Sequence, residues 1–133
     1  MMKKKIKNLV QNSPYKKRIL FLGELSNMNS FYDSLDIFLL CSRWEGMSNL
    51  LNEVLSYGIP CVSTKVDGCV ELLENGRYGI LTEINNVEEI TQGLKNIINK
   101  KVHFVASESI NHIKNNFSLE KMITETERIF FPN

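Results

Sequence analysis

A chain of 133 residues is long enough for one domain with its own core, and its 43% apolar and 23% charged residues are ordinary for a soluble globular protein. The formal net charge of +1 identifies no partner by itself, and no nucleic acid partner is expected. The lysine-rich start lacks the apolar run of a signal peptide, and no segment reaches the length of a membrane span. The three cysteines have no CxxC spacing, so the sequence favours a cytoplasmic protein without a disulfide framework or zinc site.

The charge is unevenly distributed along the chain. Residues 1–18 contain seven basic side chains and no acidic one, whereas the remaining residues carry nine basic against fifteen acidic side chains, a net charge of −6. One interpretation is the solvated face of a short helix. The alternative is attraction to phosphates or to an anionic membrane, which predicts peripheral contact with the inner membrane face.

Apolar patterning predicts helices and strands in alternation. The first part indicates a basic helix over 3–12, a strand over 19–22, a short helix or turn over 28–34 and a strand over 37–41. A helix capped by Ser48 or Asn49 follows, Gly58 ends it, and Pro60 opens a strand over 61–63. The last part indicates a short helix over 70–74, a strand over 78–81, a helix over 87–99 and a final helix after Ser118.

This alternation predicts an α/β fold, with a Rossmann-like parallel sheet of about four strands flanked by helices. Residues 1–133 are expected to form a single domain. In such open sheets, ligands bind beyond the carboxyl ends of the strands.

Two glutamates stand at that edge of the predicted sheet. Glu45 follows a buried strand, and Glu53 lies on the next helix, off its apolar stripe. The free amides of the helix start, over residues 46–50, lie between them and suit a diphosphate. Carboxylates accept charge-assisted hydrogen bonds from sugar hydroxyls, so the arrangement predicts a nucleotide-sugar site. In the alternative interpretation, Glu45 caps a turn and Glu53 is a solvated surface residue.

Five motifs in this order resemble those of the nucleotide-sugar half of GT-B-fold glycosyltransferases, specifically glycosyltransferase family 4. They are Ser42-Arg-Trp-Glu45-Gly46, Glu53, Gly58-Ile-Pro60-Cys-Val62, Gly68-Cys-Val-Glu71 and Asn75-Gly76-Arg-Tyr-Gly79-Ile80. The resemblance runs from about Ile19 to Lys100, and Phe117-Ser118 also resembles the start of the family's last helix.

The resemblance implies a role for each site residue. Glu45 is expected to be the catalytic contact to the donor sugar near the reacting carbon, and Glu53 to hold the ribose. The backbone amides of the intervening segment are expected to hold the diphosphate, through Gly46, Met47, Ser48, Asn49 and Leu50. The implied reaction is retaining hexosyl transfer from a nucleotide-diphosphate sugar to a glycan or lipid acceptor, without a protein nucleophile. No cofactor is expected, since the nucleotide-sugar is a substrate, and no Asp-x-Asp motif suggests a metal site.

The sequence also departs from this family. A GT-B enzyme has two such domains, and the family's early strand and Gly-Arg-x(4)-Lys-Gly stretch are not found here. We therefore expect the C-terminal portion of a glycosyltransferase, partnered by an N-terminal acceptor domain or by a second copy. Two alternatives are a non-catalytic nucleotide-sugar-binding or interaction module, and a sugar-nucleotide epimerase. His103 and His112 are predicted to be surface residues rather than ligands.

Overall fold

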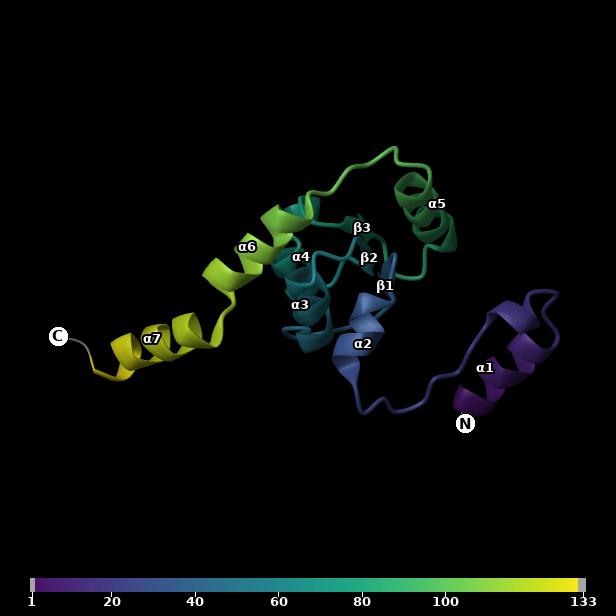
Figure 1. Cartoon of the computed structure of the whole chain (residues 1–133), viewed down its shortest axis with the longest axis horizontal. Helices are drawn as coiled ribbons and strands as arrows, with labels where there is room; N and C mark the ends of the chain where they lie inside the picture. Colours follow the sequence, from purple (N-terminus) through teal and green to yellow (C-terminus); the bar gives the residue numbers. More distant parts are fainter. Residues whose placement is uncertain (1, 132–133) are drawn as a thin grey trace.

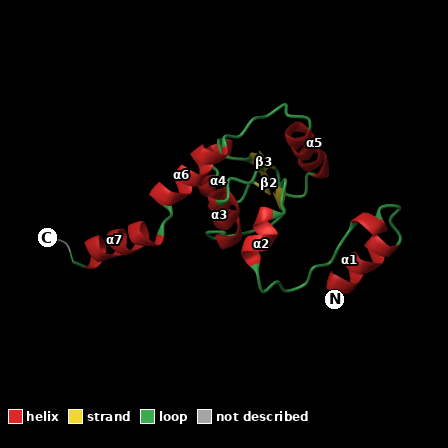
Figure 2. Cartoon of the chain, in the orientation of Figure 1, coloured by secondary structure: helices red, strands yellow, loops and turns green. Residues whose placement is uncertain are grey.

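The protein is described from a computed structural model that covers residues 2–131. Three parallel strands form its sheet in the order β1 (Phe38–Leu40), β2 (Cys61–Thr64) and β3 (Ile80–Thr82) (Figure 1). Figure 2 shows this small sheet surrounded by helices. The predicted α/β fold with a parallel sheet and flanking helices is therefore confirmed.

The described residues form seven α-helices: α1 (Met2–Gln11), α2 (Met28–Asp33), α3 (Asn49–Ser56), α4 (Asp67–Leu72), α5 (Val87–Ile98), α6 (Ala106–Asn116) and α7 (Leu119–Phe130). Two short 3₁₀ helices cover Lys16–Arg18 and Glu74–Gly76. Ser48 and Ser118 cap α3 and α7, as predicted, each accepting a hydrogen bond from the amide three residues on.

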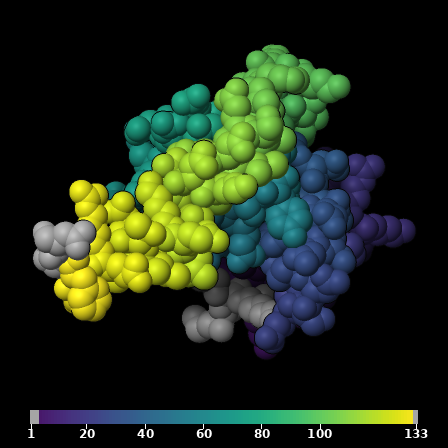
Figure 3. All heavy atoms as spheres, turned by 60° about the vertical axis from the view of Figure 1, so that its left-hand side comes forward, coloured from purple at the N-terminus to yellow at the C-terminus, as the bar shows by residue number. Residues whose placement is uncertain are grey.

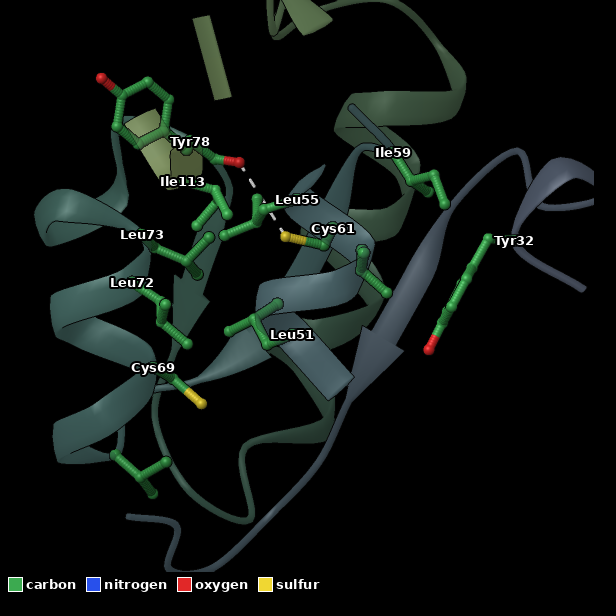
Figure 4. Close-up of a cluster of buried hydrophobic side chains, with 12 residues drawn as sticks. Tyr32, Leu51, Leu55, Ile59, Cys61, Cys69, Leu72, Leu73, Tyr78 and Ile113 are labelled. Atoms are coloured by element: carbon green, nitrogen blue, oxygen red, sulfur yellow. Dashed lines mark hydrogen bonds between the residues drawn. The ribbon is translucent and has the colours of Figure 1, made fainter. Parts of the chain in front are cut away.

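The strand β2 is the centre of the molecule, because all four of its residues are buried. Its successive side chains face opposite sides of the sheet. Cys61 belongs to the main core with α3, α4 and α6, shown in Figure 4, whereas Val62 faces α5. There α5 packs closely at Gly93, where a Cβ would lie 3.3 Å from the Val62 Cγ1 atom. The sheet is thus covered on both faces, as its continuous apolar strands require.

The main core forms where α3 packs against α6 and α4. Leu51, Val54 and Leu55 of α3 are fully buried. Gly58 ends the helix with a φ of 69°, in the left-handed region that favours glycine. A Cβ at Gly58 would lie only 2.7 Å from the Cβ of Ala106, so the end of α3 lies directly against the start of α6.

The structure corrects two predicted elements and adds a helix that was not predicted. Residues 19–22 form no strand, and Leu20 is 78% exposed. A strand must pair with a neighbouring strand, and within residues 2–131 the edge strand β1 pairs only with β2. The short helix predicted over 70–74 instead spans Asp67–Leu72, because Glu74 and Asn75 adopt positive φ angles. The helix α6 was not predicted, since it buries only Ser109 and Ile113.

The first and last helices lie outside this body, at opposite ends of the view in Figure 1. In Figure 3, α7 stands out at the surface beyond α6, and it has no buried residue. Within residues 2–131, no helix combines the length and the apolar character needed to cross a membrane.

Candidate nucleotide-sugar site

The loop after β1 holds Glu45 in a defined orientation. The Ser42 hydroxyl donates a hydrogen bond of 2.7 Å to Oε1 of Glu45, which is half-buried. The backbone oxygen of Ser42 in turn accepts a 2.6 Å hydrogen bond from the Thr64 hydroxyl at the end of β2. A chain of hydrogen bonds therefore fixes the carboxylate relative to the carboxyl ends of two strands, and the bond to the carboxylate is charge-assisted.

The segment that follows Glu45 lies unusually close to α4. A Cβ built on Gly68, the second residue of α4, would lie 1.6 Å from the Gly46 carbonyl oxygen and 3.2 Å from the Met47 Cα. No residue with a side chain fits at position 68 without moving this segment. The glycine of the Gly68-Cys-Val-Glu71 motif thus allows the loop to approach the helix.

The start of α3 presents free backbone donors beside this loop. The buried Ser48 side chain accepts the Leu51 amide at 3.3 Å. The amides of Asn49 and Leu50, the first two of the helix, precede the first intrahelical hydrogen bond and point outward along the axis. Such a helix start attracts an anion through its N–H groups and its dipole.

Glu53 is held by a tyrosine that sequence reasoning missed. The Tyr32 hydroxyl donates a hydrogen bond of 2.5 Å to Oε2 of Glu53, across 21 residues of sequence. Tyr32 is 2% exposed and packs against the ring of Tyr57, with ring centroids 5.0 Å apart. Burial, together with the hydrogen bond and the charge of Glu53, raises the pKa of the Tyr32 phenol far above its usual value. Tyr32 is therefore a neutral donor at every physiological pH.

Four of the predicted residues border three separate hollows around the start of α3. Glu45 lines one of about 220 Å³ with Trp44 and Lys65. Met47 and Asn49 line a second, of about 490 Å³, together with residues of the junction between α6 and α7. Leu50 lines a third, of about 530 Å³, together with residues of the 20–25 segment and α2. The structure thus places these four residues in separate hollows around the start of α3 rather than in a single cavity.

The two histidines have different environments. His103 is exposed, as predicted. His112 is half-buried instead, with its ring 4.3 Å from that of Tyr78 and 5.4 Å from that of Phe117. Its Nε2 atom is buried and has no hydrogen-bond partner in the described part of the chain. The surface prediction is therefore wrong for His112, because α6 turns this residue towards the ring of Tyr78. Across residues 2–131, no three His, Cys, Asp or Glu side chains are arranged to hold a metal ion.

The fold matches a solved glycosyltransferase structure. Sucrose-phosphate synthase from Thermosynechococcus elongatus superposes with a TM-score of 0.85 at 15% identity, over 96% of this chain and 33% of that one. The likeness confirms the GT-B glycosyltransferase fold. The profile of the family described as Glycosyl transferases group 1 matches residues 1–100, and the chain belongs to this family.

Curated relatives of similar sequence are bacterial transferases and a synthase. The chain is 30% identical to the UDP-Gal:alpha-D-GlcNAc-diphosphoundecaprenol alpha-1,3-galactosyltransferase of Escherichia coli, over 86% of this chain and 30% of the relative. It is 28% identical to the N-acetyl-alpha-D-glucosaminyl L-malate synthase of Bacillus anthracis, over 95% of this chain and 34% of the relative. The chain therefore spans about a third of the length of these relatives.

Proposed function

We propose that this chain is the donor-binding portion of a retaining glycosyltransferase that uses a nucleotide-diphosphate sugar. The observation that carries the proposal is the position of Glu45, which Ser42 and Thr64 orient beside the open start of α3. A diphosphate bound by free amides would bring a sugar hydroxyl within reach of a carboxylate that is already oriented.

Each predicted residue has a role in this proposal. Glu45 contacts the donor sugar near its reacting carbon, and Glu53, held by Tyr32, accepts hydrogen bonds from the ribose hydroxyls. The backbone amides of residues 46–50 hold the diphosphate. The acceptor attacks the face from which the diphosphate leaves, and the departing phosphate takes the acceptor proton. This route assigns no role to a metal ion or a protein nucleophile.

The acceptor is proposed to be a glycan or a lipid-linked sugar. The name of the Escherichia coli relative describes galactosyl transfer to a GlcNAc-diphosphoundecaprenol. A comparable acceptor would place this protein at the cytoplasmic face of the membrane, in polysaccharide synthesis. We propose that the acceptor binds mainly outside these 133 residues, on an N-terminal acceptor domain or a second copy.

Calorimetric titration with UDP, GDP and ADP, and then with their sugars, tests donor binding. We expect one diphosphate series to bind saturably, and Glu53→Gln to lower the affinity for the nucleoside diphosphate itself. Glu45→Gln should lower the affinity for the sugar-bearing ligand only, since Glu45 contacts the sugar in this proposal. Glu88→Gln is the matched control, because Glu88 is an exposed glutamate in the first turn of α5. Equal losses for all three variants would contradict the proposed roles.

A second candidate is a non-catalytic interaction module, which the exposed apolar side of α7 favours. Leu119 and Met122 are 64% and 60% exposed, and Ile123 is 46% exposed. Exposed apolar patches of this kind drive association. Concentration-dependent dimerisation in sedimentation, without binding of any nucleotide, would favour this function over the transferase.

A further inference from the structure

The basic end of the chain forms a surface whose residues have no role in the proposed donor site, although part of it borders the hollow that Leu50 lines. It consists of α1, the 3₁₀ helix Lys16–Arg18 and the extended segment Ile19–Leu22, which we call the basic surface. Seven of the sixteen basic residues lie here, and the first acidic residue of the chain is Glu24. Figure 1 shows α1 standing away from the sheet, and residues 4–9 of this helix are exposed.

The same surface exposes apolar side chains between its lysines. Ile6 and Leu9 lie on one side of α1, three residues apart, and are 47% and 68% exposed. Lys5 and Lys7 lie to either side of this apolar strip and are exposed. Lysines in such flanking positions can extend their ammonium groups away from a buried apolar strip.

The extended segment continues the pattern beyond the helix. The segment directly follows the three bases of the 3₁₀ helix, and its Leu20 and Leu22 are 78% and 54% exposed. The Lys7 ammonium lies 5.7 Å from the ring centroid of Phe21, a cation–π contact that joins this segment to α1. The helix and the segment can therefore meet the same partner together.

We propose that the basic surface docks this protein onto an anionic membrane. Charge attraction alone also fits a nucleic acid, but phosphate neutralisation does not require exposed leucines and isoleucines. Interfacial binding uses both features, since apolar side chains enter the acyl boundary while basic ones meet anionic headgroups. The inference rests on the proposed location at the cytoplasmic membrane face, and it specifies the residues and the lipid charge involved.

Co-sedimentation of the chain with vesicles tests this inference. One vesicle preparation is phosphatidylcholine mixed with phosphatidylglycerol, and the other is phosphatidylcholine alone. Each basic residue near an anionic surface contributes roughly fivefold to partitioning, so K4Q/K5Q/K7Q should lower binding on the order of 100-fold. Glutamine has a helix propensity close to that of lysine, so α1 should persist, which circular dichroism checks.

Two matched controls distinguish docking through the basic surface from nonspecific electrostatic or hydrophobic binding. K95Q/K100Q/K101Q removes the same charge from three exposed lysines around the end of α5, and it should change partitioning by less than about threefold. Leu9→Ser should weaken binding several-fold, whereas Leu119→Ser, at a comparably exposed leucine of α7, should not.

Several results would overturn the inference. Equal binding to both vesicle types would do so, as would equal losses of vesicle binding in the two triple-lysine variants. Binding to duplex DNA without binding to vesicles would favour a nucleic acid partner instead. Nucleotide titration without lipid measures the donor site independently. A failure of membrane docking is thereby distinguished from a failure of the proposed transferase function.

Discussion

The close approach at Gly68 makes the clearest prediction about how the site is built. In Gly68→Ala, the new methyl carbon would stand 1.6 Å from the Gly46 carbonyl oxygen. A carbon and a non-bonded oxygen approach to about 3.3 Å, so the loop must move by roughly 1.7 Å to accommodate it. Overpacking of this kind destabilises a fold by roughly 1–3 kcal/mol. Because a displacement of about 1 Å disrupts a preorganised site, we expect donor affinity to fall by roughly 10- to 100-fold.

Thermal unfolding and nucleotide titration measure the two effects separately. Gly93→Ala is the matched control, since Gly93 is also a buried helical glycine, and a Cβ there would meet the side chain of Ile80 at 3.2 Å. It should affect Tm without affecting donor affinity, because α5 lies on the other face of the sheet. Gly46→Ala has no atom within 4 Å of its Cβ and should leave Tm near wild type. Wild-type Tm and affinity in Gly68→Ala would refute the reasoning.

Three further predictions concern titratable side chains. Tyr32→Phe removes the hydrogen bond to Glu53 and should lower the free energy of unfolding by about 1 kcal/mol, as denaturation would show. It should also weaken nucleoside diphosphate binding several-fold in calorimetry. The control Tyr57→Phe should leave that affinity unchanged. Burial raises the pKa of the Cys61 thiol to about 12, so the unfolded chain ionises first and stability should fall as pH rises from about 9 to 12. Cys61→Ala should flatten this pH dependence of Tm, and an unchanged slope would contradict it. At pH 8, iodoacetamide should modify exposed Cys41 well before Cys61, as mass spectrometry would show.

Sequence patterns predicted the elements whose apolar residues are local and continuous. The strand expected over 37–41 is present as Phe38–Leu40, and the helix expected over 87–99 is present as Val87–Ile98. The start and stop of α3 were also predicted, because Ser48 and Gly58 act through their own backbone neighbourhood.

What could not be predicted depends on contacts between distant segments. The apolar run over 19–22 has the composition of a strand, but forming one needs a paired backbone that β1 does not supply. No sequence pattern indicated that Tyr32 belongs to the site, since its hydrogen-bond partner Glu53 lies 21 residues away. The reason for glycine at position 68 appears only when α4 is packed against the Gly46 carbonyl. The roles proposed for Glu45 and Glu53 in donor binding remain predictions.

The most direct test of the donor site is an amide NMR titration of the full chain with UDP, GDP and ADP. We expect saturable shifts for one of these nucleotides at residues 46–50 and around Glu53, with smaller changes on α5. In Gly68→Ala, the same shifts should need much higher nucleotide concentrations. A folded chain that shows no shifts, or shifts confined to the basic lysines of α1, would contradict a donor site at the start of α3.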